Sequence, residues 1–137
     1  VCAIITQAVA AVAHMHAGPG ICHRDLEPSN FIVEEGGNHP TLLLKLTDFD
    51  FAAPMDIVCR TPRGSLPFAA PEVILRRHYW GGPADVWSLS VVVFEVLCRT
   101  CVLERALQLW TSPWSVGDRA AAAQLLVEHF SAEGSAP

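Results

Sequence analysis

Lysine is nearly absent from this sequence, and no positively charged segment is present. Lys45 is the only lysine, and acidic residues outnumber basic ones by 14 to 9, which gives a formal net charge of −5 at pH 7. Domains that bind nucleic acids usually present a basic patch or stripe, and an acidic balance disfavours anionic surfaces. We therefore expect no nucleic acid among the partners.

Long hydrophobic runs and a secretory signal peptide are also missing. The best candidate for a membrane span, residues 86–98, is 13 residues long and contains Glu95, whereas a spanning helix needs about 18 apolar residues. We expect no membrane partner and interpret this run as a buried core helix. The first residue is Val1 rather than Met, so we expect the natural N-terminus to lie upstream.

The spacing of the cysteines shows no disulfide framework. Their number, 5, is odd, and disulfide-dense folds are typical of secreted proteins. The pattern instead indicates a reduced intracellular protein, and we expect a cytoplasmic location. The cysteines are Cys2, Cys22, Cys59, Cys98 and Cys101.

The first half of the chain predicts a helix, two strands and a loop. Hydrophobic residues make up 51% of the 137 residues, enough for the core of one domain. Apolar residues recur at helical spacing over residues 2–16, and a Gly-Pro-Gly breaker follows. Residues 31–33 and 42–46 predict strands joined by a loop of about eight residues. From residue 51 to 66 the apolar residues show neither helical nor strand periodicity, which predicts a long irregular loop. Loops of this kind are usually functional.

Helices dominate the second half. A short helix is expected to open at residues 70–72, and a stronger one over residues 84–99 is apolar nearly all round, which indicates burial. Residues 103–110 predict one or two helical turns, residues 119–130 a final helix and residues 131–137 a tail. The predicted fold class is mainly α with a small β-hairpin.

The residues with the most chemical information lie in the loops. Asp25 and Asn30 are five apart between the first helix and the first strand, and Asp48 follows the second strand. Phosphoryl transfer needs one carboxylate to accept the incoming hydroxyl's proton, and an amide oxygen plus a second carboxylate to hold magnesium on the phosphates. A lone Asp and Asn at this spacing is more often a solvated polar turn, so the hypothesis depends on a longer pattern.

That longer pattern resembles the protein kinase superfamily. Residues 23–30, HRDLEPSN, resemble the HRDLKPxN catalytic loop of Ser/Thr protein kinases with Glu27 in place of Lys. Residues 48–50, DFD, resemble DFG with its Gly replaced. Residues 64–72, GSLPFAAPE, resemble the G-[ST]-x-x-Y-x-A-P-E that ends the activation segment, and residues 85–90, DVWSLS, resemble D-x-W-S-x-G. The motifs occur in the family's order at compatible spacings.

The resemblance implies a fold and a set of site residues. The fold is the α+β C-terminal lobe of a kinase, truncated at both ends, with residues 1–130 as the partial domain. Asp25 would be the catalytic base, while Asn30 and Asp48 would bind magnesium and, through it, ATP. Ile32 would lie under the adenine ring.

The resemblance also implies structural and regulatory residues. His23 and Phe49 would stack in the hydrophobic spine of the site, and Asp85 would anchor the backbone of the catalytic loop. Glu72 would be a structural residue, which in relatives pairs with the arginine of a D-P-x-x-R-like element. No such element follows Phe130 in this sequence.

Two positions suggest control by phosphorylation. Arg24, directly before Asp25, is expected to pair with a phosphate on the activation segment. Thr61, three residues before Gly64, stands where many relatives carry that phosphate, although an ordinary loop threonine explains it equally well. Ser65 lies on the substrate side, at the position that favours Ser/Thr over Tyr specificity.

Two substitutions depart from the family pattern. Glu27 replaces a Lys that contacts the transferred phosphate, and the loss of one such donor commonly costs about 10²–10³ in rate. Asp50 replaces a Gly that gives its turn conformational freedom, and its carboxylate either adds a metal ligand or faces solvent.

Three functions follow from these observations. The first is a fragment of a Ser/Thr protein kinase that transfers the γ-phosphate of ATP to protein hydroxyls, with Mg²⁺ as cofactor and the missing N-terminal lobe as a necessary partner. The second is a pseudokinase that acts as a scaffold, which Glu27 and Asp50 favour. The third is a small-molecule kinase, which the complete activation segment disfavours. We expect the isolated chain to be inactive and to bind Mg–ATP weakly.

Overall fold

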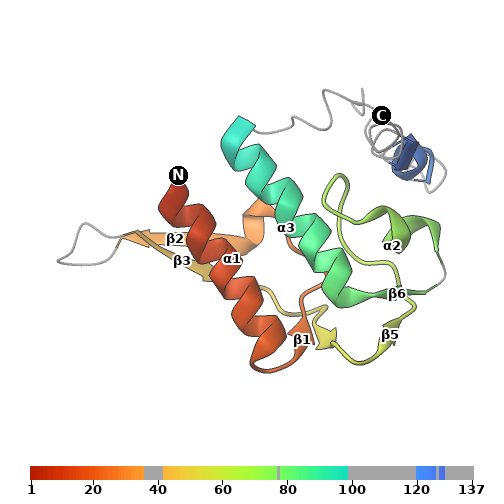
Figure 1. Ribbon diagram of the computed structural model, residues 1–137, viewed down its shortest axis with the longest axis horizontal. Coiled ribbons are helices and arrows are strands. Elements are labelled where there is room, and N and C mark those ends of the chain that lie inside the picture. The colour runs from red at the N-terminus through yellow and green to blue at the C-terminus, as the bar shows by residue number, and fades with distance from the viewer. Residues whose placement is uncertain (36–41, 77, 99–119, 126, 129–137) are drawn as a thin grey trace, which may run out of the picture.

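Two helices that lie side by side form the centre of the molecule (Figure 1): α1 (Cys2–Ala17) and α3 (Gly81–Cys98). The buried residues of α1 are Ala8, Val12 and Met15, and their spacing of three to four positions puts them on one face. This confirms the helix predicted over residues 2–16. The computed structural model describes residues 1–35, 42–76, 78–98, 120–125 and 127–128.

Helix α3 begins three residues earlier than predicted, at Gly81, because Pro83 is tolerated in the first turn of a helix. Its N-terminal turn packs very closely on the rest of the protein. A Cβ atom placed on Gly81 would lie 2.1 Å from the Cys22 sulfur. The helix buries two carboxylates, Asp85 and Glu95, among its apolar residues.

The predicted hairpin is present. Strands β2 (Phe31–Glu35) and β3 (Leu42–Leu46) are antiparallel, and Val33 pairs with Leu44. The hairpin projects to one side of the two helices (Figure 1), and β3 packs against α1. Leu44 is buried in that contact, whereas Ile32 on the other face of the sheet is 47% exposed.

Two small sheets were not predicted. Strand β1 (Ile21–Cys22) pairs with β4 (Ala53–Pro54), and β5 (Val58–Cys59) pairs with β6 (Tyr79–Trp80), both antiparallel. The expectation of an irregular segment from residue 51 to 66 was therefore wrong at these positions. Strands of two residues are too short to show an alternating pattern in the sequence.

The buried side chains form two clusters. One lies between α1, the loop of residues 23–30 and the hairpin, and is built on Val12, Met15 and Leu26. The other lies under α2 (Pro71–Leu75) and the start of α3. Its buried members are Cys22, Ala53, Cys59, Ala70, Val73, Tyr79 and Ala84.

Helix α3 is long and apolar enough to cross a membrane by length and composition alone, with 18 residues and a mean hydropathy of 1.3. Half of it is buried inside the protein, and core helices of soluble proteins pass the same test. The uninterrupted apolar run of residues 86–98 is shorter than this helix because the helix begins with Gly, Pro and Asp85. Burial against α1 and the loops supports a core helix.

The C-terminal part is described only in short pieces. Residues 120–125 and 127–128 are helical, within the helix predicted over residues 119–130. The turns predicted at residues 103–110 and the tail at residues 131–137 lie outside the described residues.

Candidate active site

Asp85 holds the backbone of the loop that carries Asp25. Its carboxylate is fully buried and accepts hydrogen bonds from the backbone amides of His23 and Arg24, both at 2.7 Å. The Nε2 atom of His16 lies 2.8 Å from the same carboxylate. Hydrogen bonds to an ionised acceptor are roughly twice as strong as neutral ones. The two hydrogen bonds from the amides of His23 and Arg24 hold Arg24 in a left-handed conformation with φ of 72°. Such a conformation persists only where the surrounding structure enforces it.

Asn30 joins the loop of Asp25 to the segment of Asp48. Its side-chain Nδ2 donates to the backbone oxygen of Asp25 at 2.8 Å. Its own backbone oxygen accepts from the amide of Thr47 at 2.9 Å and from the hydroxyl of Thr47 at 3.1 Å. The next residue, Asp48, is therefore fixed beside the loop that carries Asp25. The structure thus brings together the three residues that the sequence had singled out.

The Asp25 carboxyl is more basic than an ordinary aspartate. Partial burial raises its pKa, and the negative charges of Glu27 and Asp48 raise it further, while His23 acts in the opposite direction. Within the described part of the chain the Asp25 side chain accepts no hydrogen bond.

The oxygens of Asn30 and Asp48 suit a magnesium ion. The Asn30 Nδ2 atom points to the backbone oxygen of Asp25, so the Asn30 Oδ1 atom is turned away from it. No described residue donates a hydrogen bond to the Asn30 Oδ1 atom. Asp48 is exposed and has φ of 62°. Mg²⁺ prefers oxygen ligands and is usually held by one or two carboxylates together with substrate phosphates. No group of three His, Cys, Asp or Glu side chains suited to a metal occurs among the described residues.

His23 and Phe49 pack against each other under this site. Their ring centroids are 4.9 Å apart with the planes tilted by 56°. The Nε2 atom of His23 lies 2.9 Å from the carbonyl oxygen of Thr47, and since a carbonyl only accepts, this nitrogen carries the proton. The buried Nδ1 has no partner among the described residues.

Arg24 is bound by neutral groups. Its Nε donates to the Tyr79 hydroxyl at 3.0 Å, its Nη1 to the Phe51 carbonyl at 3.3 Å and its Nη2 to the Thr61 carbonyl at 2.8 Å. The Tyr79 hydroxyl also donates to the Thr61 carbonyl at 3.0 Å. Arg24 is therefore next to the backbone of Thr61, whose side chain is exposed. The described residues offer Arg24 no carboxylate partner.

Tyr79 and Glu27 take part in contacts that the sequence did not predict. Tyr79 completes the surroundings of Arg24, and nothing in its spacing had distinguished it. Glu27 accepts hydrogen bonds from the hydroxyls of Ser29 and Ser65. Asp50 is exposed and is absent from the residues with positive φ, so the substitution of Gly at this turn imposes no left-handed strain.

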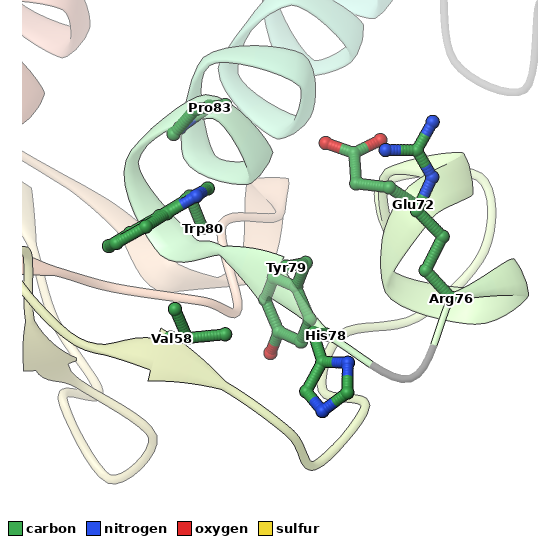
Figure 2. A pocket seen from close by; sticks show the side chains of 7 residues that line it. All are labelled: Val58, Glu72, Arg76, His78, Tyr79, Trp80 and Pro83. Atoms are coloured by element: carbon green, nitrogen blue, oxygen red, sulfur yellow. The ribbon is translucent and has the colours of Figure 1, made fainter.

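Glu72 lies apart from these residues, at a pocket of about 380 Å³ (Figure 2). In the described part of the chain its carboxylate has no hydrogen-bond or ion-pair partner. The pocket lies between α2, β5, β6 and the start of α3, and it includes none of Asp25, Asn30 and Asp48. It is lined by Val58, Glu72, Arg76, His78, Tyr79, Trp80 and Pro83.

Comparison with known proteins identifies the class. A family model described as the protein kinase domain matches residues 1–112, and the chain therefore belongs to the protein kinase family and contains part of that domain.

The curated relatives carry kinase names. CBL-interacting protein kinase 16 of Oryza sativa subsp. japonica is 42% identical over 97 residues, which are 67% of this chain and 20% of that protein. Maternal embryonic leucine zipper kinase of Xenopus laevis is 40% identical over 96 residues, 67% of this chain and 14% of that protein. CBL-interacting serine/threonine-protein kinase 15 of Arabidopsis thaliana is 42% identical over 96 residues, 66% of this chain and 21% of that protein. The chain thus spans about a fifth or less of these relatives.

Proposed function

We propose that this chain is the C-terminal-lobe portion of a protein kinase that transfers the γ-phosphate of ATP to Ser or Thr hydroxyls of proteins. The observation that carries the proposal is the pair of contacts made by Asn30, which tie the Asp25 loop to the Asp48 segment. The kinase names of the relatives support the same activity.

Each of the three residues has a distinct task. Asp25, made more basic by burial, accepts the proton of the acceptor hydroxyl. Asn30 through Oδ1 and Asp48 through its carboxylate hold Mg²⁺, which neutralises the charge of the phosphates. Ile32, exposed on the outer face of β2, offers an apolar surface for the adenine ring.

The proposed reaction needs the N-terminal lobe. Residues equivalent to a Gly-rich loop and its partner lysine cover the phosphates in this family. The single lysine of this chain, Lys45, forms an exposed ion pair with Glu34 at 2.6 Å on the hairpin. The proposal therefore concerns the longer protein, in a reducing intracellular setting that the free thiols of Cys2, Cys22, Cys59 and Cys98 support.

Arg24 and Thr61 are proposed to regulate the activity. The guanidinium already reaches the Thr61 backbone, and a phosphate on the exposed Thr61 side chain would offer it an ionised partner in place of neutral ones. Charge-assisted bidentate pairing of Arg with phosphate is the stronger interaction.

A pseudokinase that serves as a scaffold is the second candidate, and Glu27 favours it. A carboxylate at this position adds negative charge beside the phosphates, where the family pattern has a lysine. The kinase names of the relatives and the complete activation segment give no support to a small-molecule kinase.

A phosphotransfer assay tests the proposal. The chain extended by its N-terminal lobe is incubated with γ-labelled ATP, Mg²⁺ and a mixture of Ser/Thr-containing proteins. We expect Mg²⁺-dependent transfer that falls at least about 10²-fold in Asp25→Asn, while Asp56→Asn, an exposed loop control, keeps the rate. Equal rates in wild type and Asp25→Asn would refute it, and transfer found only after Glu27→Lys would establish the pseudokinase.

A further inference from the structure

The Glu27 carboxylate connects two segments that are distant in the sequence. One of its oxygens accepts from the Ser29 hydroxyl within the catalytic loop, and the other accepts from the Ser65 hydroxyl, 38 positions further along. Ser65 opens residues 65–69, the segment that leads into α2. The contact therefore fastens the end of the activation segment to the loop that carries Asp25.

The same segment is held by α3 at its other end. The Trp87 ring nitrogen donates to the Pro67 carbonyl at 3.5 Å, and the Ser88 hydroxyl lies 2.8 Å from the Phe68 carbonyl. Glu27 supplies the attachment on the catalytic-loop side, so residues 65–69 are fixed between the loop and the helix.

This arrangement needs a side chain at position 27 that accepts hydrogen bonds. A serine hydroxyl has one proton, and at Ser65 that proton goes to Glu27. A lysine in the same place only donates, so it would reverse the direction of the hydrogen bond and release the Ser65 proton. The substitution of Lys by Glu thus creates a contact of a different kind as well as removing a positive charge.

We propose that Glu27 is a positioning residue, which holds Ser65 and residues 65–69 in place beside Asp25 through its carboxylate. The inference rests on the proposed function in one respect: residues 65–69 are then the surface on which the substrate protein presents its hydroxyl. Loss of the contact should weaken binding of the protein substrate and leave ATP binding unchanged.

Amide hydrogen exchange tests the contact directly on this chain. Both Glu27→Leu and Ser65→Ala are expected to speed exchange of the amides in residues 65–69 about tenfold, since each removes a hydrogen bond to a charged group. The double variant should exchange no faster than Glu27→Leu alone, because Ser65→Ala removes an interaction that Glu27→Leu has already lost.

Two matched serine variants separate this effect from general loosening. Ser65→Thr keeps the hydroxyl and should restore wild-type exchange. Ser90→Ala removes a hydroxyl that bonds only within α3, to the Val86 carbonyl at 2.7 Å, and should leave residues 65–69 unchanged. Wild-type exchange in both Glu27→Leu and Ser65→Ala, or fully additive effects in the double variant, would overturn the proposal.

Kinetics on the chain extended by its N-terminal lobe test the consequence for substrate. Ser65→Ala should raise KM for the protein substrate about tenfold and leave KM for ATP within twofold of wild type. Ser65→Thr, which keeps the hydroxyl, should have the wild-type KM for the protein substrate. A rise confined to KM for ATP would contradict the positioning role. If the wild-type protein transfers no phosphate, the proposed function fails, and the exchange experiment still decides whether Glu27 holds Ser65.

Discussion

The backbone amide of Arg24 donates a hydrogen bond to the Asp85 carboxylate over 2.7 Å, although the residues are 61 positions apart. The amide of His23 makes the same contact, also at 2.7 Å. Helix α3 therefore fixes the loop that carries Asp25 through one fully buried side chain.

Replacing Asp85 by Ala should lower the free energy of unfolding by about 3 kcal/mol, because two backbone amides, one of them in a buried hydrogen bond, lose their acceptor. Urea unfolding followed by circular dichroism measures the effect. Asp56→Ala, at an exposed loop position, should stay within about 0.5 kcal/mol of wild type. An unfolding midpoint in Asp85→Ala equal to that of the control would contradict the anchoring role.

Gln7 should stabilise the outer edge of β3. Its Oε1 accepts from the Leu44 amide at 2.9 Å and its Nε2 donates to the Leu42 carbonyl at 3.0 Å, as a neighbouring strand would. Gln7→Glu replaces the donor by an acceptor that faces a carbonyl, and it should cost about 1 to 2 kcal/mol in urea unfolding. Thr6→Ala, on the exposed side of α1, serves as the control. A Gln7→Glu protein as stable as wild type would show that the contact is not formed.

Gly81→Ala should be destabilising because the added Cβ would lie 2.1 Å from the Cys22 sulfur and 2.9 Å from its Cβ. Overpacking of this kind typically costs about 1–3 kcal/mol. Cys22→Ala combined with Gly81→Ala should recover part of the loss, since the sulfur is the nearer atom. Thermal unfolding of the two single variants and the double variant measures the coupling, and strict additivity would exclude the steric cause.

Stability should decrease at alkaline pH. Burial raises the pKa of the Cys22 thiol to about 11, and burial also raises the pKa of Tyr79. Between the ordinary thiol pKa of 9.0 and about 11, the unfolded chain has lost a proton at Cys22 that the folded chain retains, so the free energy of unfolding falls as pH rises through this range.

Urea unfolding at a series of pH values from 8 to 11 tests this, with Cys22→Ala as the comparison. The variant should show a shallower decline than wild type, because the contribution of Cys22 is removed while that of Tyr79 remains. Identical slopes in the two proteins would rule out a contribution from Cys22.

The sequence predicted the helices and strands whose hydrophobic residues form a recognisable pattern. Apolar spacing located α1 and α3, and two short apolar runs located the hairpin of β2 and β3. The pairs of β1 with β4 and β5 with β6 escaped prediction because two residues show no alternation, and their pairing depends on contacts between distant segments.

The candidate site could be predicted in part. The resemblance of residues 23–30 and 48–50 to kinase motifs singled out Asp25, Asn30 and Asp48. What the sequence did not reveal is how they are held: the two hydrogen bonds from Thr47 and the contact of Glu27 with Ser65 join positions that have no local pattern in common.

The most direct test of the account is a crystal structure of the chain, extended by its N-terminal lobe, with Mg²⁺ and a non-hydrolysable ATP analogue. We predict a metal ion roughly 2.0–2.1 Å from Oδ1 of Asn30 and from a carboxylate oxygen of Asp48, with Asp25 facing the γ-phosphate. A bound nucleotide whose metal is held by other residues, with these three side chains directed to separate surfaces, would contradict it.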